Sequence, residues 1–328
     1  MSTINVVKWG LHLLEVEITT RCDLNCGHCY NRNNKSQDMP IAEVIKLIEL
    51  AEDNNVLRFI ISGGEAVLHP DFANLAAYLI EKKPSLKMVI QSNGLIGKHN
   101  VELLKGFDIV HLSFELDNSK IRKSSVEYIV DTAHRFIDNG IYTYLFSTIH
   151  PGNIDRIDSM VEIANKNNLD IGFNICIPGH RKNLQLLVEQ KMYVMEKLYM
   201  LYLDNRILRF TSPFVSILKG QIEQEFTRIK GGCTAGVAAC VVLANGDVIP
   251  CPFFRVKAGN IYEEQLEKIW LNSELFIALR QRSLFNDPCG SCQYLAHCGG
   301  CRARAYEETG VFNGFDPDCP NSLIKRPD

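Results

Sequence analysis

The spacing of hydrophobic residues changes repeatedly along the first two thirds of the chain. From about residue 12 to 205, short runs that alternate apolar and polar residues are followed by longer runs with apolar residues every three or four positions. The first pattern is typical of strands and the second of amphipathic helices. The predicted strands are Leu14–Thr19, Leu57–Ser62, Lys87–Ser92, Ile109–Glu115, Ile141–Ile149 and Asp170–Ile177. The predicted helices are Ile41–Asp53, Asp71–Lys83, Val126–Asn139, Asp155–Asn167 and Leu186–Leu203.

Strands that alternate with helices predict an α/β fold with parallel strands and helical crossovers. Six strands are too few to close an eight-stranded barrel, which leaves a partial (β/α)6 barrel or an open doubly wound sheet. In both architectures the functional groups lie beyond the carboxyl ends of the strands.

The strands also predict which face of the sheet is polar. With a period of two, residues on one face of the first, fourth and sixth strands are largely polar, and their neighbours on the other face are apolar. We expect the apolar face to pack under the helices and the polar face to line the inside of the barrel. The predicted inner residues are Glu15, Glu17, Thr19, His111, Ser113, Glu115, Gly172, Asn174 and Cys176.

Charge and hydropathy exclude two classes of partner. Lys and Arg number 35 against 38 Asp and Glu, a formal net charge of −3. This balance lacks the basic surface of a nucleic-acid-binding protein and the polybasic segment of a membrane anchor. No apolar run reaches about 18 residues, so we expect no membrane span. The N-terminus lacks the pattern of a secretion signal, so we expect a cytoplasmic protein.

Twelve cysteines are the unusual feature of the composition. In a reducing cytosol, metal ligation explains them better than disulfides. Eight lie between Cys233 and Cys319, where apolar periodicity is weak outside Leu266–Arg280, as is typical of a domain stabilised by bound metal. We therefore divide the chain into a barrel (1–205), a bridging segment (206–232), a cysteine-rich domain (233–320) and a tail (321–328).

Three other cysteines, Cys22, Cys26 and Cys29, follow the first predicted strand with the spacing C-x3-C-x2-C. Three thiolates on one loop can bind three irons of a [4Fe–4S] cluster and leave the fourth iron open. Zinc is the alternative, but structural zinc sites take four protein ligands and commonly use C-x2-C pairs. The place of the loop, at the carboxyl end of a strand, favours the iron–sulfur cluster.

These cysteines resemble those of the radical SAM superfamily. The resemblance extends to Ser62-Gly63-Gly64-Glu65 after the second strand and to Ser92-Asn93-Gly94 after the third. It implies a partial (β/α)6 barrel in which the open iron binds the amino and carboxylate groups of S-adenosylmethionine (SAM). It also implies reductive cleavage of SAM to a 5′-deoxyadenosyl radical, which takes a hydrogen atom from a substrate.

The resemblance also suggests which residues contact SAM. His28 takes the family's aromatic position beside the last ligand, and Glu115 stands where Asp is usual. Paired glycines permit close backbone approach, and a glutamate can pair with an ammonium group. The expected cofactor-binding residues are His28, Gly63, Gly64, Glu65, Asn93, Ser113 and Glu115.

The C-terminal cysteines resemble the SPASM extension of radical SAM enzymes, which carries two auxiliary [4Fe–4S] clusters. The resemblance thus implies three [4Fe–4S] clusters in all. It assigns one auxiliary cluster to Cys233, Cys240, Cys251 and Cys301. It assigns the other to Cys289, Cys292, Cys298 and Cys319. Two zinc ribbons are the alternative, but they would leave four of these eight cysteines without a role.

Cys176 is the cysteine left over. On the inner face of the sixth predicted strand it is a candidate hydrogen-atom donor to a substrate radical, or simply a buried strand cysteine. His150 and His180, at strand ends, are candidate proton-transfer groups or ordinary loop histidines.

The resemblance leaves the substrate open. SPASM members similar to this chain modify ribosomally synthesised peptides, or act on tetrapyrroles in haem and haem d1 pathways. An anionic tetracarboxylate should attract a cluster of cations, and only modest candidates are present, so a peptide is favoured. These candidates are Arg181, Lys182, Arg206 and Arg209. A non-catalytic iron–sulfur electron-transfer protein is a third interpretation, which would leave Gly63-Gly64-Glu65 and the open three-cysteine site unexplained.

The same reading suggests partners. Only 21 residues precede Cys22, too few for the winged-helix domain with which many peptide-modifying members recognise their substrate. We therefore expect a peptide substrate that binds at the mouth of the barrel or with a separate small recognition protein. A flavodoxin- or ferredoxin-type protein is the expected reductant, and no nucleic-acid or membrane partner is expected.

Overall fold

The fold is seen in a computed structural model that describes residues 9–31, 36–95, 101–116, 125–177, 181–211, 232–296 and 298–319. These residues form one sheet with the strand order β10-β9-β8-β1-β2-β3-β4-β5-β6-β7. Seven of its strands come from the N-terminal part: β1 Leu13–Thr19, β2 Arg58–Gly63, β3 Lys87–Ser92, β4 Ile109–Ser113, β5 Tyr142–Ile149, β6 Asp170–Ile175 and β7 Arg209–Thr211. Each pairs in parallel with the next, as the alternation of strands and helices predicts.

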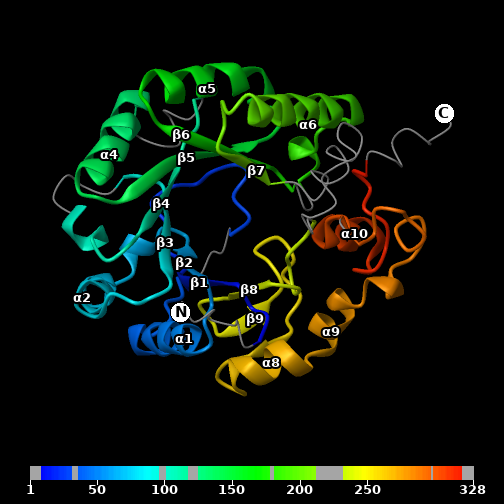
Figure 1. Cartoon of the computed structure of the whole chain (residues 1–328), viewed down its shortest axis with the longest axis horizontal. Helices are drawn as coiled ribbons and strands as arrows, with labels where there is room; N and C mark the ends of the chain where they lie inside the picture. The colour runs from blue at the N-terminus through cyan, green and yellow to red at the C-terminus, as the bar shows by residue number, and fades with distance from the viewer. Residues whose placement is uncertain are drawn as a thin grey trace, which may run out of the picture.

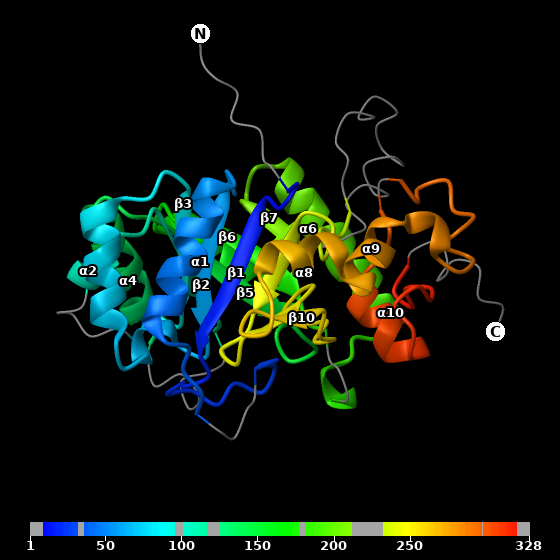
Figure 2. The same cartoon turned by 90° about the horizontal axis from the view of Figure 1, so that it is seen from below.

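Helices cover the outer side of this curved sheet (Figure 1). They are α1 Ile41–Asp53, α2 Phe72–Lys82, α4 Val126–Asp138, α5 Ile157–Lys166 and α6 Val188–Leu203. A short 3-10 helix, Val101–Leu104, precedes β4. The fold is therefore the predicted α/β partial barrel, open on the side where the C-terminal part lies (Figures 1 and 2).

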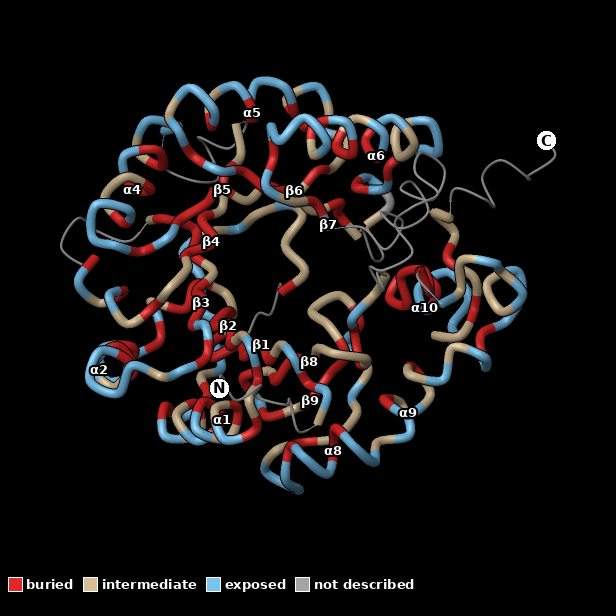
Figure 3. Tube along the Cα trace, viewed as in Figure 1, coloured by how far each residue is buried: buried red, intermediate tan, exposed pale blue. Residues whose placement is uncertain are grey.

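The core lies between the sheet and its helices, where buried segments concentrate (Figure 3). In β1, Leu14, Val16 and Ile18 belong to this core, whereas Glu15 and Glu17 alternate with them and face inward. The same alternation in β4 and β6 leaves the predicted polar residues on the inner face. Buried helix residues at three- and four-residue spacing supply the other half of the core.

The cysteine-rich part extends the same sheet. Strand β8 (Ala239–Val242) pairs in parallel with β1, and β9 (Asp247–Ile249) returns antiparallel to it. The turn between them places Gly246 at φ +84°, a conformation that glycine adopts without strain. Strand β10 (Gly259–Asn260) completes the edge. The remaining helices are α8 Leu266–Asn272, α9 Glu274–Arg280 and α10 Arg302–Thr309.

The structure differs from the sequence-based expectation in three elements. The helix expected over Leu266–Arg280 is broken at Ser273, whose φ of −60° and ψ of 127° are extended. Strand β7 lies inside the segment expected to be a bridge, and α10 was not expected at all. The domain boundaries themselves stay a prediction, and the expected tail at 321–328 lies outside the described residues. No helix in the described ranges is long and apolar enough to cross a membrane.

Candidate active site and cysteine groups

The loop with Cys22, Cys26 and Cys29 leaves the carboxyl end of β1, and all three are free thiols. The Cys29 N–H donates to the Cys26 carbonyl at 3.2 Å, which closes a turn between the last two cysteines. Partial burial raises the pKa of the Cys22 thiol, and the nearby negative groups of Glu65, Asp23 and Cys29 raise it further. Crowded thiols of this kind need a bound metal to ionise together.

The glycines after β2 hold this loop in place. The Gly64 N–H donates to the Thr19 carbonyl at 2.8 Å, and the Glu65 N–H donates to the Arg21 carbonyl at 2.7 Å. A Cβ on Gly63 would lie 2.2 Å from the Thr19 oxygen, and a Cβ on Gly64 would lie 2.2 Å from the Arg21 oxygen. The two glycines are therefore required by the approach of the protein's own backbone.

Glu65 is buried beside this loop and uses only one of its carboxylate oxygens. Its Oε2 accepts the Asn93 N–H at 2.6 Å, while its Oε1 is buried with no hydrogen-bond partner in the described part of the chain. The Asn93 side chain in turn donates to Asp23 of the cysteine loop at 2.7 Å. Burial raises the pKa of Glu65 to about 7. A buried carboxylate oxygen without a donor is suited to a ligand's ammonium group.

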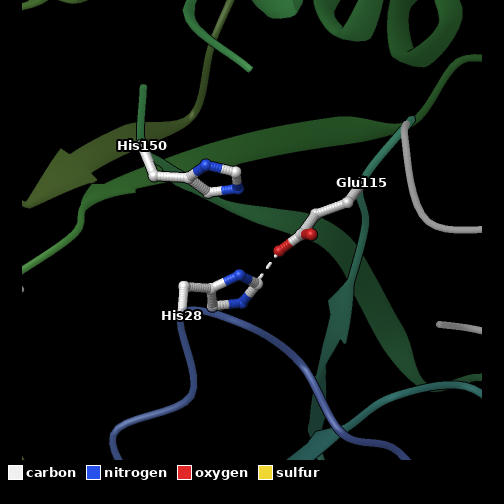
Figure 4. A group of neighbouring side chains, drawn as sticks. All are labelled: His28, Glu115 and His150. Carbon is white, nitrogen blue, oxygen red and sulfur yellow. Dashed lines mark ion pairs between the residues drawn. The ribbon is translucent and has the colours of Figure 1, made fainter. Parts of the chain in front are cut away.

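His28, Glu115 and His150 meet across the carboxyl ends of β1, β4 and β5 (Figure 4). His28 Nε2 lies 3.0 Å from Glu115 Oε1, and the two imidazole rings stack with centroids 5.4 Å apart. One ligand atom from each residue lies within 4.8 Å of the others, a spacing that a metal ion could use. The sequence placed His28 and Glu115 in one site but did not connect His150 with them. His180 lies outside the described residues.

Hydrogen bonding argues against a metal at this group. The Gly152 N–H donates to His150 Nδ1 at 3.2 Å, so a neutral His150 carries its proton on Nε2. A protonated Nε2 cannot ligate a metal, but it can donate to an acceptor. The three side chains are therefore better suited to hydrogen-bonding a polar ligand.

The C-terminal cysteines fall into two groups. In the first, burial raises the pKa of Cys251 well above its usual value, and the charges of Cys233 and Cys301 raise it further. In the second, burial raises the pKa of Cys298 to about 12, with contributions from Cys319, Asp316 and Cys289. Cys292 follows Cys289 in a turn, with its N–H 3.2 Å from the Cys289 carbonyl. Cys233, Cys251 and Cys301 thus influence one another in one group and Cys289, Cys298 and Cys319 in the other, and the division of the ligands between two clusters stays a prediction.

The fourth cysteine predicted for the first group is Cys240. It pairs in register with Leu14, on the outer face of the sheet, and is fully buried in the apolar core. Burial raises the pKa of its thiol to about 12, and the only charged group that acts on it is Arg280. The first group therefore holds three cysteines, and Cys240 as a fourth ligand stays a prediction.

Comparison with known proteins agrees with this geometry. The radical SAM superfamily matches residues 16–165, and the SPASM iron–sulfur cluster-binding domain matches residues 233–299. The chain belongs to the radical SAM superfamily and carries a SPASM domain. It is therefore a radical SAM enzyme, with a [4Fe–4S] cluster and SAM in its barrel and auxiliary iron–sulfur clusters in its SPASM part.

Relatives of this radical SAM enzyme act on different substrates. AdoMet-dependent heme synthase of Methanosarcina barkeri is 27% identical, over 94% of this chain and 95% of the relative. PqqA peptide cyclase of Methylorubrum extorquens is 25% identical, over 98% of this chain and 88% of the relative. The crystal structure of Streptococcus suis SuiB bound to precursor peptide SuiA has the same fold, with a TM-score of 0.76 and 22% identity, over 96% of this chain and 76% of SuiB.

The side chain of Arg181, which follows β6, hydrogen-bonds to the radical SAM cysteine loop that follows β1. Its Nη1 donates to the Gly27 carbonyl at 2.9 Å and to the Cys29 carbonyl at 2.8 Å. These contacts join parts of the chain more than 150 residues apart. The sequence suggested Arg181 as a cation for an anionic substrate, but the structure uses this guanidinium nitrogen to hold the loop.

The inner face of β1 joins the barrel to the SPASM part. Glu17 is fully buried and pairs with both terminal nitrogens of Arg255, at 3.3 and 3.1 Å. Asn31 donates to the same carboxylate at 3.3 Å, and the Arg255 guanidinium lies 5.9 Å from the centre of the Tyr30 ring. The Glu17–Arg255 ion pair, with Asn31 and Tyr30 against it, therefore links the segment after Cys29 to the segment after Cys251.

The remaining predicted site residues also lie near the carboxyl ends of the strands. Ser113 is the last residue of β4, and Cys176 follows β6 with its N–H 2.8 Å from the Ile149 carbonyl. Burial raises the pKa of the Cys176 thiol to about 11, and the negative charges of Glu115 and Glu307 add to the rise. The thiol therefore stays protonated at neutral pH.

A buried hydrogen-bond network around Asp316 contacts both groups of SPASM cysteines, and it was not predicted from the sequence. Asp316 accepts the Cys301 N–H at 2.6 Å and two hydrogen bonds from Arg304, at 2.9 and 2.8 Å. The Asp316 carbonyl accepts the Cys319 N–H at 3.1 Å, so one residue contacts the backbone of both groups. Lys191 of α6 pairs with Asp318, which ties this network to the barrel. The signal in the sequence was the acidic pair Asp316 and Asp318 close to Cys319.

Proposed function

We propose that this radical SAM enzyme modifies a ribosomally synthesised peptide by abstracting a hydrogen atom from it. The observation that carries the catalytic part of the proposal is the unpartnered Oε1 of Glu65 beside the three-cysteine loop. A protein that only transfers electrons would not need a buried carboxylate oxygen placed to accept the ammonium group of a ligand.

The residues fit the resident groups. Cys22, Cys26 and Cys29 would hold the cluster, and Glu65 would accept the ammonium group of SAM. His28, Glu115 and Ser113 would hydrogen-bond its nucleoside, with Gly63, Gly64 and Asn93 shaping the site. When bound, these groups supply a 5′-deoxyadenosyl radical that takes a hydrogen atom from the substrate. The protein orients that radical and excludes water from it.

The SPASM cysteines would hold two auxiliary [4Fe–4S] clusters, one on Cys233, Cys251 and Cys301 and one on Cys289, Cys292, Cys298 and Cys319. Cys176 keeps its proton and lies near Glu115, which supports a role as a hydrogen-atom donor to the substrate. A Cys176→Ala variant that forms the full amount of product would exclude that role.

The name of one relative, a solved structure with the same fold and the contacts of Arg181 support a peptide substrate. One relative is named as a peptide cyclase, and a structure with the same fold was solved with a precursor peptide. In addition, the Arg181 guanidinium already donates to two backbone carbonyls, which makes it a poor receptor for the carboxylates of a tetrapyrrole. A separate peptide-recognition protein and a flavodoxin- or ferredoxin-type reductant would complete the system.

Tetrapyrrole modification is the second candidate. It is favoured by the likeness to a heme synthase over nearly the full length of both chains. The two functions differ in the substrate that should stimulate SAM cleavage.

The test is anaerobic 5′-deoxyadenosine release by the reconstituted, reduced enzyme. We expect a peptide encoded beside this gene to stimulate release and to change in mass, because hydrogen abstraction starts its modification. A porphyrin with propionate side chains serves as the competing substrate, and a Cys26→Ala variant as the inactive control. Stimulation by the porphyrin alone would replace the peptide proposal, and no release under any condition would favour an electron carrier.

A further inference from the structure

Four polar side chains converge on the inner face of the sheet, away from the SAM-binding end. They are Arg58 of β2, His111 of β4, Tyr144 of β5 and Arg209 of β7. Their neighbours in sequence, Phe59, Val110, Leu145 and Phe210, all belong to the outer core. The alternation of strand residues therefore turns the four toward the inside of the barrel. Arg58 begins β2, and Arg209 pairs in register with Gly172, two residues into β6.

The contacts place these groups together. The His111 and Tyr144 rings lie with centroids 4.6 Å apart, and the Arg209 guanidinium lies 5.6 Å from the centre of the Phe146 ring. Burial, followed by the positive charges of Arg209 and Arg58, lowers the pKa of His111 to about 3. The same two guanidiniums act on the Tyr144 hydroxyl. His111 is therefore neutral, and both cations lie within electrostatic reach of one buried hydroxyl.

These groups lack an acidic partner. Tyr144 is 3% exposed, and its hydroxyl has no hydrogen-bond partner among the described residues. Within the same ranges, no carboxylate lies within 4.0 Å of the side-chain nitrogens of Arg58 or Arg209. Asp170 of β6, which pairs in register with Tyr144, accepts the Tyr142 hydroxyl at 2.5 Å. The Tyr144 hydroxyl is a buried donor without an acceptor among the described residues, and the two half-buried guanidinium groups beside it carry positive charge that no described carboxylate pairs with, so the group favours an anion.

We propose that Arg58, Arg209 and Tyr144 form a binding site for a carboxylate group on the inner face of the barrel sheet. Guanidinium groups recognise carboxylates through paired hydrogen bonds, and the tyrosine hydroxyl supplies a further donor. Phosphate sites typically use clusters of free backbone N–H groups, whereas the Arg58 N–H is already bonded to the His12 carbonyl at 3.1 Å. The proposal does not depend on the identity of the substrate.

Thermal melting of the iron-loaded enzyme tests the site. Sodium acetate and N-acetylglycine are the probes, at ionic strength held constant with sodium chloride. We expect both to raise the melting temperature in a saturable way, because a ligand that binds only the folded state stabilises it. N-acetylglycinamide, which has no charge, should have no effect.

Variants then locate the effect. Arg58→Gln and Arg209→Gln should each weaken acetate binding by about tenfold or more, and Tyr144→Phe by roughly threefold. Arg156→Gln, which alters an arginine paired with Asp155 on the surface, should leave the affinity unchanged. Unchanged affinity in both Arg58→Gln and Arg209→Gln would overturn the site, and tighter binding of inorganic phosphate than of acetate would overturn the assignment to carboxylates.

A measurement on the unaltered enzyme covers the case in which the variants do not fold. Phenylglyoxal modifies accessible guanidinium groups, and mass spectrometry locates the modified arginines. Acetate should protect Arg58 and Arg209 but not Arg156. Equal modification with acetate and with chloride would contradict the proposal.

Discussion

At the residue scale, the buried carboxyl group of Glu15 on the inner face of the sheet makes the stability of the folded protein depend on pH. This carboxyl group is buried, and its Oε1 accepts the Ser62 hydroxyl at 2.7 Å. Burial raises the pKa of Glu15 from 4.5 to about 7, and the neighbouring charge of Glu17 adds to the rise. A folded state that binds a proton more tightly than the unfolded state loses stability as that proton leaves.

The sign of the pH dependence follows from this shift. The contribution of Glu15 to stability is complete below pH 4.5, falls as the pH rises toward about 7, and is constant above it. Glu15→Gln cannot ionise and keeps a group that accepts the Ser62 hydroxyl. We therefore expect the variant to gain stability relative to the parent between pH 5 and 8, by on the order of 2 kcal/mol.

Melting temperatures of the loaded enzyme across this pH range measure the gain. Gln185→Ala, at an exposed position before α6, is the control and should differ from the parent by the same amount at every pH, because neither side chain titrates. A difference between Glu15→Gln and the parent that does not change with pH would show that Glu15 titrates normally.

At the scale of elements, the cysteine loop depends on a contact from the far side of the barrel. We expect Arg181→Gln to release the loop, because it removes charge-assisted hydrogen bonds to the Gly27 and Cys29 carbonyls. The SAM-binding cluster should then lose iron to an anaerobic chelator about tenfold faster than in the parent. Electron paramagnetic resonance can follow this cluster separately from the auxiliary clusters, whose rates should not change.

Two variants make the Arg181 experiment specific. Arg206→Gln changes an exposed arginine between α6 and β7 and should have no effect. Arg181→Lys keeps the charge but not the forked donor geometry and should give an intermediate rate. If the rate of iron loss in Arg181→Gln equals that of the parent, the contacts of the loop with Gly64, Glu65 and Asn93 are sufficient to hold it.

The elements that the sequence predicted well are those with a complete local signal. Helix α1 has the predicted bounds because its buried residues recur at helical spacing over three turns. Strand β7 has only three residues, too few to establish a period, and its place in the sheet depends on pairing with β6. Helix α10 was missed because it buries Arg302 and Arg304, which form hydrogen bonds inside the protein rather than with solvent.

The candidate site follows the same rule. Cys22 and Glu65 could be assigned because short motifs carry them. The contact of His28 with Glu115 and His150 could not, since it depends on how three strands curve toward one another. Arg209 was noted as a candidate cation, but its grouping with Arg58 and Tyr144 was out of reach, because the three residues come from separate strands.

At the scale of the whole molecule, barrel and SPASM part share one sheet. Strand β8 continues the sheet beyond β1, and Arg255 reaches back to Glu17 on the inner face. Because β8 belongs to the shared sheet, a cysteine in β8 lies on either the inner or the outer face of that sheet. Cys240 is held on the outer face by its pairing with Leu14.

This geometry makes a sharp prediction for two cysteines that the family resemblance treats alike. Cys301→Ala should lose one auxiliary cluster, or about four irons per chain, because Cys301 lies with Cys233 and Cys251. Cys240→Ala should keep the iron content and the resonance signals of the parent and lower only the melting temperature, since it removes a buried sulfur from the core. Iron analysis of the two purified variants decides between three and four cysteine ligands. Equal iron loss in both would mean that Cys240 is a ligand of this cluster, as the family resemblance implies.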